Sequence, residues 1–154
     1  GEGEGEGGGG DGGEGEGGGS SGQSSPRFEA VLLNGAASSA NAYALVACAA
    51  GGAHTALILA DGGVYTCGRG ECGQLGHGTH ECERSPRRVL SLKGLRVRRA
   101  ACGNTHTLLL TSAGVPYVCG AGSFGRLGLG GRANVALPTP VPSLSAHTIV
   151  QISA

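Results

Sequence analysis

Residues 97–130 read VRRAACGNTHTLLLTSAGVPYVCGAGSFGRLGLG, and residues 45–78 read LVACAAGGAHTALILADGGVYTCGRGECGQLGHG. These stretches belong to a longer repeat, because residues 45–96, shifted by 52 positions without a gap, match residues 97–148 at 18 of 52 positions. A shared bias toward glycine and alanine would give only about five matches. A third copy begins at residues 149–154. Such a repeat indicates an array of similar structural units.

Each copy divides into short extended runs separated by glycine or proline. In the second copy these runs are VRRAACG, HTLLLTSAG, VPYVCGAG and PTPVPSL. Runs of this length, rich in Val, Leu, Tyr and Thr, are typical of strands joined by tight turns. Four short antiparallel strands in about fifty residues are the pattern of a β-propeller blade. The sequence therefore predicts an all-β fold, part of a propeller built from four-stranded repeats of about 52 residues.

The order V-x-x-x-A-C-G-x-x-H-T-x-x-L-x-x-x-G-x-x-Y-x-C-G-x-G-x-x-G-x-L-G-x-G resembles the repeat of the regulator of chromosome condensation family. The resemblance covers residues 45–154 and implies a seven-bladed propeller. Where the family usually has Trp before the first glycine of G-x-G-x-x-G-x-L-G, this chain has Cys67 and Cys119. The plant ultraviolet-B photoreceptor of this family depends on clustered tryptophans, and a chain without Trp does not fit that role.

The repeat predicts a division of the chain into five segments. These are a disordered, low-complexity Gly/Glu-rich tail (1–25), a linker or remnant of a preceding repeat (26–44), repeat 1 (45–96), repeat 2 (97–148) and the start of repeat 3 (149–154). An alternative phasing places repeats near 63–114 and 115–154. Residues 1–20 contain six acids and no base. Because the chain has no Met, we expect it to be a fragment of a longer protein.

Positions that recur in both copies are expected to have structural roles. They are Gly51, His54, Gly68, Gly73, Leu75 and Gly76 in repeat 1, and Gly103, His106, Gly120, Gly125, Leu127 and Gly128 in repeat 2. Each histidine is expected to bond the backbone of its turn, because the ring recurs in every unit. The recurring leucines, Leu57, Leu75, Leu109 and Leu127, are expected to be buried.

Gly68–Gly73 also fits the G-x-G-x-x-G spacing of a dinucleotide-binding loop. Such a loop must lead directly into a helix, whose N-terminus holds the pyrophosphate. Here Leu-Gly-x-Gly follows instead, and the same spacing recurs at Gly120. The Gly-Lys-Ser/Thr of a P-loop is missing as well. We therefore interpret both loops as blade turns and expect no cofactor.

Metal binding and catalysis are not expected either. Cys72, His77, His80 and Cys82 lack a C-x2-C element, and repeat 2 has Phe124, Leu129, Arg132 and Asn134 at these positions. No Ser/His/Asp set or carboxylate pair can be assembled, so the sequence predicts a non-enzymatic protein. The uncharged run 42–60 is interrupted by paired glycines and is not interpreted as a membrane span. Without a secretory signal, we expect reduced thiols and an intracellular location, cytoplasmic or nuclear.

One basic cluster is not demanded by the repeat. It comprises Arg84, Arg87, Arg88, Lys93, Arg96, Arg98 and Arg99, and the residues 52 positions further along the chain include no Lys or Arg. The cluster is either a solvated edge that discourages strand pairing or a contact for an acidic partner. Nucleic acid and anionic lipid are alternatives, but no interleaved aromatic residues support base stacking. An acidic protein surface is therefore the preferred partner, a small GTPase among the candidates.

The function predicted from these features is that of a non-catalytic protein–protein interaction module in a larger regulatory protein. The family resemblance implies two alternatives. The first is a guanine-nucleotide exchange factor for a small GTPase, and the second is the substrate-recruiting propeller of a ubiquitin ligase.

Overall fold

The computed structural model describes residues 44–154. The predicted tail at 1–25, and all of the predicted linker except residue 44, lie outside the described residues. Within residues 44–154, no helix is long and apolar enough to cross a membrane.

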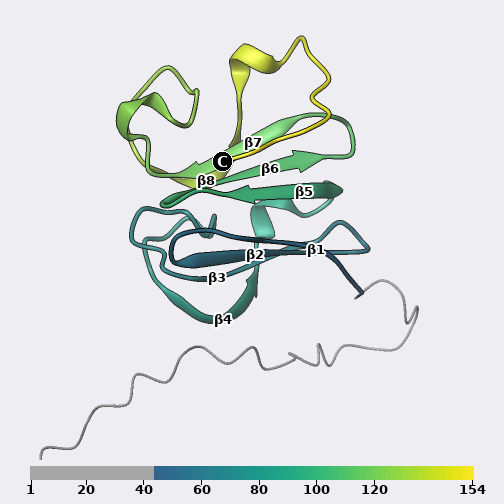
Figure 1. Cartoon of the computed structure of the whole chain (residues 1–154), viewed down its shortest axis with the longest axis vertical. Coiled ribbons are helices and arrows are strands. Elements are labelled where there is room, and N and C mark those ends of the chain that lie inside the picture. Colours follow the sequence, from purple (N-terminus) through teal and green to yellow (C-terminus); the bar gives the residue numbers. More distant parts are fainter. Residues whose placement is uncertain (1–43) are drawn as a thin grey trace, which may run out of the picture.

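In the described part of the chain, eight strands form two separate four-stranded antiparallel sheets (Figure 1). The first sheet has the strand order β1 (Leu45–Ala50), β2 (His54–Leu59), β3 (Val64–Gly68) and β4 (Glu83–Arg88). The second sheet has the strand order β5 (Val97–Cys102), β6 (His106–Thr111), β7 (Pro116–Gly120) and β8 (Val135–Pro140). Three short 3-10 helices lie between or after strands: η1 (Leu90–Leu92), η2 (Ser123–Gly125) and η3 (Pro142–Leu144). The all-β prediction, with four antiparallel strands per repeat, is confirmed.

The two sheets share one register. His54 pairs with Gly68 in the first sheet, and His106 pairs with Gly120 in the second. Both sheets have a register shift near the start of the first strand and another between the third and fourth strands. Equal sequence positions thus have equal places in the two sheets, as a tandem repeat requires.

The sheets pack face to face around an apolar core. Ile58, Val64, Val89 and Leu92 from the first repeat meet Val97 and Leu109 from the second repeat. Contacts between sheets come mainly from β1 and β2 against β5, and β4 and β8 make no comparable contact with each other. The blades therefore converge at β1 and β5 and diverge toward β4 and β8, which is the wedge shape that a propeller needs.

Three of the four leucines predicted to be buried are buried: Leu75, Leu109 and Leu127. The prediction for Leu57 was wrong, because its side chain is only half-buried. Neighbouring residues of a strand point to opposite faces. Ile58 points into the core between the sheets, so Leu57 points away from the second sheet.

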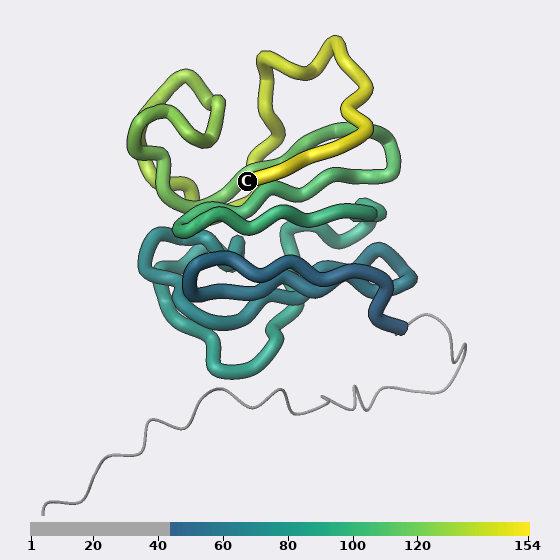
Figure 2. The backbone as a smooth tube through the Cα atoms, in the orientation of Figure 1, coloured from purple at the N-terminus to yellow at the C-terminus, as the bar shows by residue number. Residues whose placement is uncertain are grey.

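Residues after η3 pass back along the second sheet, at the yellow end of the tube in Figure 2. Ile149 N donates to Gly114 O at 3.0 Å, just as Val97 N donates to Gly62 O at 3.1 Å. The start of the third copy therefore repeats the contact that begins β5, although residues 149–154 do not form a strand.

Candidate protein-interaction surface

Each sheet has two ends with different loops. The turn between β2 and β3 (60–63) and the connection from β4 to β5 (89–96) lie at one end, here called the linker end. The turn between β1 and β2 (51–53) and the loop between β3 and β4 (69–82) lie at the other, here called the loop end. Candidate functional residues occur at both ends.

The glycine loop of repeat 1 lies at the loop end and contacts the second sheet. The carbonyl oxygen of Gln74 accepts a hydrogen bond from Thr107 Oγ1 at 2.8 Å, and Gly78 N donates to Ala136 O at 2.9 Å. A Cβ atom added to Gly73 would lie 2.7 Å from Ala136 Cα. This loop therefore joins one blade to the next, and its glycines permit a close approach between backbones.

The equivalent loop of repeat 2, which contains Gly125 and Gly128, is much more exposed. A Cβ atom at Gly125 would meet no atom within 4 Å. Phe124 is 90% exposed and has a φ of 59°, a left-handed conformation uncommon for a residue other than glycine. The Arg126 guanidinium lies 5.8 Å from the centre of the Phe124 ring.

His54 links the two repeats rather than capping its own turn. The Thr107 hydroxyl donates to Gln74 O, so the 2.8 Å contact between His54 Nε2 and Thr107 Oγ1 has the ring as donor. The prediction that His54 bonds the backbone of its own turn was wrong. Its Nδ1 is buried without a hydrogen-bond partner among the described residues. Burial, aided by the nearby His106, lowers the pKa of His54 and keeps the ring neutral.

His106 occupies the same position in repeat 2, and its Nδ1 is also buried without a partner in the described part of the chain. A Cβ atom on Gly103 would lie 2.2 Å from the His106 ring, so the ring packs directly on this turn. Burial and the charge of Arg126 lower the pKa of His106. Among residues 44–154, neither histidine has the carboxylate partner that general base catalysis commonly uses.

Three of the six thiols lie in surroundings that disfavour the thiolate. Burial raises the pKa of Cys119 to about 12, and it also raises the pKa of Cys67 and Cys102. The nucleophilic thiolate is therefore disfavoured at these positions. Within residues 44–154, no three His, Cys, Asp or Glu side chains are grouped so that they could hold a metal ion.

The seven basic residues of the predicted cluster do not form one surface. Arg84 lies near the loop end, at the start of β4, whereas Arg88 lies at the linker end of the same strand. Lys93 and Arg96 follow in the connection to β5, and Arg98 and Arg99 lie near the start of β5. Arg87, which precedes Arg88 on β4, forms an ion pair with Glu83 at 2.6 Å.

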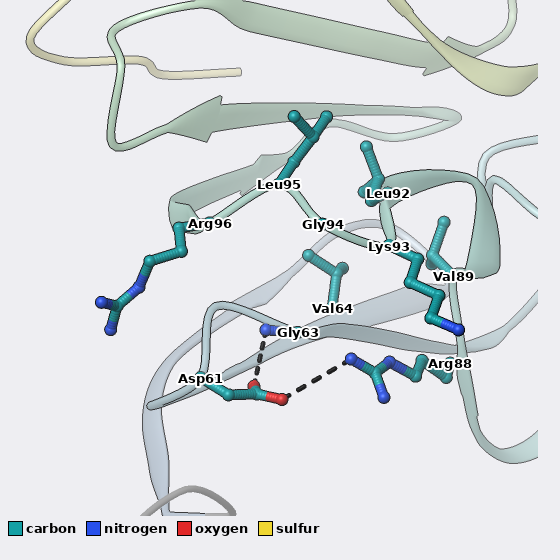
Figure 3. Close-up of a pocket in the computed structure, with 10 residues that line it drawn as sticks. All are labelled: Asp61, Gly63, Val64, Arg88, Val89, Leu92, Lys93, Gly94, Leu95 and Arg96. Carbon is teal, nitrogen blue, oxygen red and sulfur yellow. Dashed lines mark hydrogen bonds and ion pairs between the residues drawn. The ribbon is translucent and has the colours of Figure 1, made fainter.

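At the linker end, three of these cations surround a small pocket, here called the linker pocket (Figure 3). Its volume is about 120 Å³, and its lining comprises Asp61, Gly63, Val64, Arg88, Val89, Leu92, Lys93, Gly94, Leu95 and Arg96. Asp61 accepts a hydrogen bond from Gly63 N at 2.7 Å and lies 3.5 Å from Arg88. Sequence reasoning missed Asp61, because its approach to Arg88 depends on the pairing of β3 with β4.

The charges of the linker pocket are specific to repeat 1. At the positions of Asp61, Arg88, Lys93 and Arg96, repeat 2 has Ala113, Pro140, Ser145 and Thr148. Both repeats build the same four-stranded blade without sharing these charges. The fold therefore does not require them.

Comparison with known proteins defines the class. Residues 61–110 and 114–154 match the regulator of chromosome condensation (RCC1) repeat, and residues 46–74 match a second description of the same repeat. The chain belongs to the RCC1 repeat family, and its two sheets are propeller blades of that family.

Among curated relatives, the human probable E3 ubiquitin-protein ligase HERC3 is 47% identical over 102 residues, which are 66% of this chain and 10% of HERC3. The Arabidopsis thaliana ultraviolet-B receptor UVR8 is 38% identical over 105 residues, 68% of this chain and 24% of UVR8. The chain thus spans a quarter or less of these relatives.

Solved structures show the same fold. Human WBSCR16 has a TM-score of 0.68 and 24% identity, over 73% of this chain and 29% of that one. Yeast RCC1 (Prp20), solved in complex with Kap60, has a TM-score of 0.65 and 22% identity. The match covers 72% of this chain and 28% of the yeast chain.

Proposed function

We propose that this chain is a non-catalytic protein-interaction module of a larger regulatory protein, and that its linker end binds an acidic surface of a partner protein. The observation that carries this proposal is the set of charges at Arg88, Lys93 and Arg96, which repeat 1 has and repeat 2 lacks. Charges that a blade can do without are available for recognition.

The charge balance of the described residues supports a cationic contact surface. Residues 44–154 contain ten Lys and Arg and four Asp and Glu, a net charge of +6 with His neutral. Three of these carboxylates form ion pairs, Asp61 with Arg88, Glu71 with Arg69 and Glu83 with Arg87. Lys93, Arg96 and Arg98 have no carboxylate partner among residues 44–154, so their charge is free to attract an anionic partner.

An acidic protein fits these residues better than nucleic acid or a membrane does. Binding of single-stranded nucleic acid relies on aromatic side chains on which bases stack, and no Phe, Tyr or Trp of the described residues lines the linker pocket. Anionic membranes are typically bound by clusters of about four to eight Lys and Arg. The linker pocket has three described cations, Arg88, Lys93 and Arg96, and Arg88 is already paired with Asp61. The cytoplasm or nucleus is the proposed location.

Binding of polyglutamate, measured by isothermal titration calorimetry, tests the charge part of this proposal. Wild-type protein should bind, with affinity falling between about 50 mM and about 200 mM salt. The double variant Lys93→Gln/Arg96→Gln should bind at least about tenfold more weakly. Arg84→Gln/Arg132→Gln removes equal charge elsewhere and serves as the control. An equal loss in both double variants would contradict a defined surface.

A role in substrate recruitment for a ubiquitin ligase is the first alternative. The 47% identity to part of HERC3 supports it, although this chain matches only a tenth of that protein. The test is to append this chain to a catalytic ligase domain and measure ubiquitin transfer to proteins that it binds. Transfer that does not depend on Lys93 and Arg96 would separate this role from the acidic-partner surface.

Guanine-nucleotide exchange is the second alternative. A second solved structure of the yeast protein Prp20p describes its binding to Gsp1p and histones, but at 22% identity the likeness to this chain concerns the fold. Release of a fluorescent GDP analogue from a small GTPase, with and without this protein, measures the activity. Acceleration of release would favour exchange.

A further inference from the structure

We propose that the acidic N-terminal segment of this chain, residues 1–20, binds the cationic linker end of the same molecule and competes there with an acidic partner. The proposal rests on the proposed acidic-partner function and adds a control on access to that surface. A partner must then displace the segment before it can bind the linker end.

The two parts of the chain carry equal and opposite charge. Residues 1–43 contain seven Asp and Glu and one Arg, a net charge of −6, whereas residues 44–154 have a net charge of +6 with His neutral. Six of the seven acids lie within residues 2–16, and no base lies among them. Charge separated in this way along one chain attracts the two parts to each other.

The residues before the first blade join it at the linker end. Leu45, at the start of β1, pairs with Leu59, and Ala60 N donates to Ala44 O at 2.9 Å. The Arg96 guanidinium donates to the carbonyl oxygen of the same Ala60, also at 2.9 Å. The chain therefore enters the blade beside Arg96, so the acidic segment is attached next to the surface that it would bind.

Chain length permits this contact but does not impose it. Glu16 precedes Ala44 by 28 residues, and a chain of that length can span up to roughly 90 Å. The six-residue strands β1 and β2 are only about 20 Å long, so the acids could reach the loop end as well. The loop end has ion pairs of its own, whereas Lys93, Arg96 and Arg98 have no carboxylate partner in the described part of the chain. Charge therefore favours the linker end.

Attachment to the same chain strengthens the contact. A tethered segment binds at an effective concentration set by its linker, so attraction that is weak between separate molecules can suffice. The apparent affinity of a partner then falls with the fraction of molecules in which the surface is free. The residues that recognise the partner stay the same.

Lys93 is the only lysine of the chain, which makes the contact directly measurable. A carbodiimide joins a carboxylate to a lysine amine when the two groups are in contact. The reaction is run at about 1 µM protein, where association between chains is least. After digestion with trypsin, mass spectrometry should find residues 1–27 joined to residues 89–96. The yield should fall as salt rises from about 50 mM to about 500 mM.

The control moves the lysine to the loop end of the second blade. Lys93→Arg/Arg132→Lys keeps the composition and net charge of the chain, and its lysine should not become joined to residues 1–27. An equal yield in this control, or no joined product in the wild type, would overturn the proposal. In an equal mixture of unlabelled and isotope-labelled protein, joined peptides from different copies would overturn it too, because the segment would then bind another molecule.

A second experiment measures the effect on partner binding in the full chain. The charge of the segment is removed by the variant Glu2→Gln/Glu4→Gln/Glu6→Gln/Asp11→Asn/Glu14→Gln/Glu16→Gln. In isothermal titration calorimetry it should bind polyglutamate at least about fivefold more tightly than the wild type does. In the Lys93→Gln/Arg96→Gln background the same change should alter affinity less than about twofold. Equal gains in both backgrounds would indicate repulsion at a distance and would overturn the contact.

The outcomes separate this contact from the acidic-partner function. Equal affinity of the wild type and the neutralised variant for polyglutamate would overturn the contact but leave the acidic-partner function intact. No binding of polyglutamate by the neutralised variant would overturn that function itself, since nothing in this chain would then compete for the surface.

Discussion

At the scale of single residues, Thr107 joins the two repeats through its hydroxyl group. It accepts a hydrogen bond from His54 and donates one to Gln74 O, each at 2.8 Å, and its side chain is completely buried. Thr55, the matching residue of repeat 1, is half-buried and has no side-chain hydrogen bond among the described residues. The same residue type thus has different importance in the two copies.

Thr107→Val should destabilise the protein by at least about 2 kcal/mol, because two buried polar groups lose a partner. Valine keeps the shape of the side chain but cannot bond His54 or Gln74. Urea unfolding followed by circular dichroism measures the change. Thr55→Val is the matched control and should cost less than about 1 kcal/mol. Equal effects of the two substitutions would show that the contact between blades is unimportant.

His54 makes the stability of this contact depend on pH. Its folded pKa is lowered, mainly by burial, from an ordinary value of 6.5. Below about pH 6.5 the unfolded chain binds more protons than the folded one, so acid favours unfolding. Between about pH 7.5 and about pH 5.5 the free energy of unfolding should fall, and His54→Gln should reduce that fall. His80→Gln, at an exposed position, is the control and should leave the fall in unfolding free energy as it is in the wild type. The same fall in His54→Gln as in the wild type would show that His54 does not cause it.

Sequence reasoning identified His54 as a recurring structural residue but chose the wrong hydrogen-bond partner. Its partner lies 53 residues away, and only the packing of one sheet on the other brings the two together. The same limit applies to Leu57 and Leu109, which occupy one repeat position but face different surroundings. Periodicity specifies which face of a strand is apolar, but it does not specify what covers that face.

At the scale of elements, the glycine loops were correctly placed between the third and fourth strands of each sheet. Their spacing is a local property, so the sequence sufficed to predict it. The contact of Gly73 with Ala136 in the neighbouring blade could not be predicted. Likewise, the basic cluster was continuous in sequence, yet a strand places Arg84 and Arg88 at opposite ends of the sheet.

Gly70 provides a test of the loop. A Cβ atom there would lie 1.7 Å from the backbone oxygen of Glu81, which no side-chain movement can relieve. We expect Gly70→Ala to destabilise the protein by more than about 2 kcal/mol in chemical denaturation. Gly131→Ala is a matched control, since its Cβ would meet no atom within 4 Å. A Gly70→Ala protein as stable as the wild type would mean that this loop packs differently.

At the scale of the whole molecule, the faces of the two blades are covered unequally. Leu109 is buried against the first blade, whereas Leu57, on the outward face of that blade, is only half-buried. Leu109→Ala should therefore cost about 2–5 kcal/mol, as expected for a core leucine, and Leu57→Ala clearly less. Urea unfolding of both variants makes the comparison. The reverse order would mean that Leu57 is covered in solution.

The outer face and edge of the first blade also bear on association. Among the described residues, Leu45 and Val46 on β1 are 57% and 58% exposed, and Leu57 on β2 is half-buried. Exposed apolar side chains and unpaired strand edges are sites at which protein chains associate. In a propeller each blade packs against two neighbours, and the first blade here packs against one among residues 44–154.

We therefore expect the 154-residue chain by itself to associate or to be only marginally stable. Sedimentation velocity should show a larger average mass as concentration rises from about 5 µM to about 100 µM. Leu45→Glu/Val46→Glu should reduce association, because a charge on an edge strand opposes pairing with another chain. Leu90→Glu, which changes an exposed leucine at the linker end, is the control. A monomer with a sharp, reversible melt would show instead that these two repeats close on themselves, since an open blade face would not remain unpaired at such concentrations.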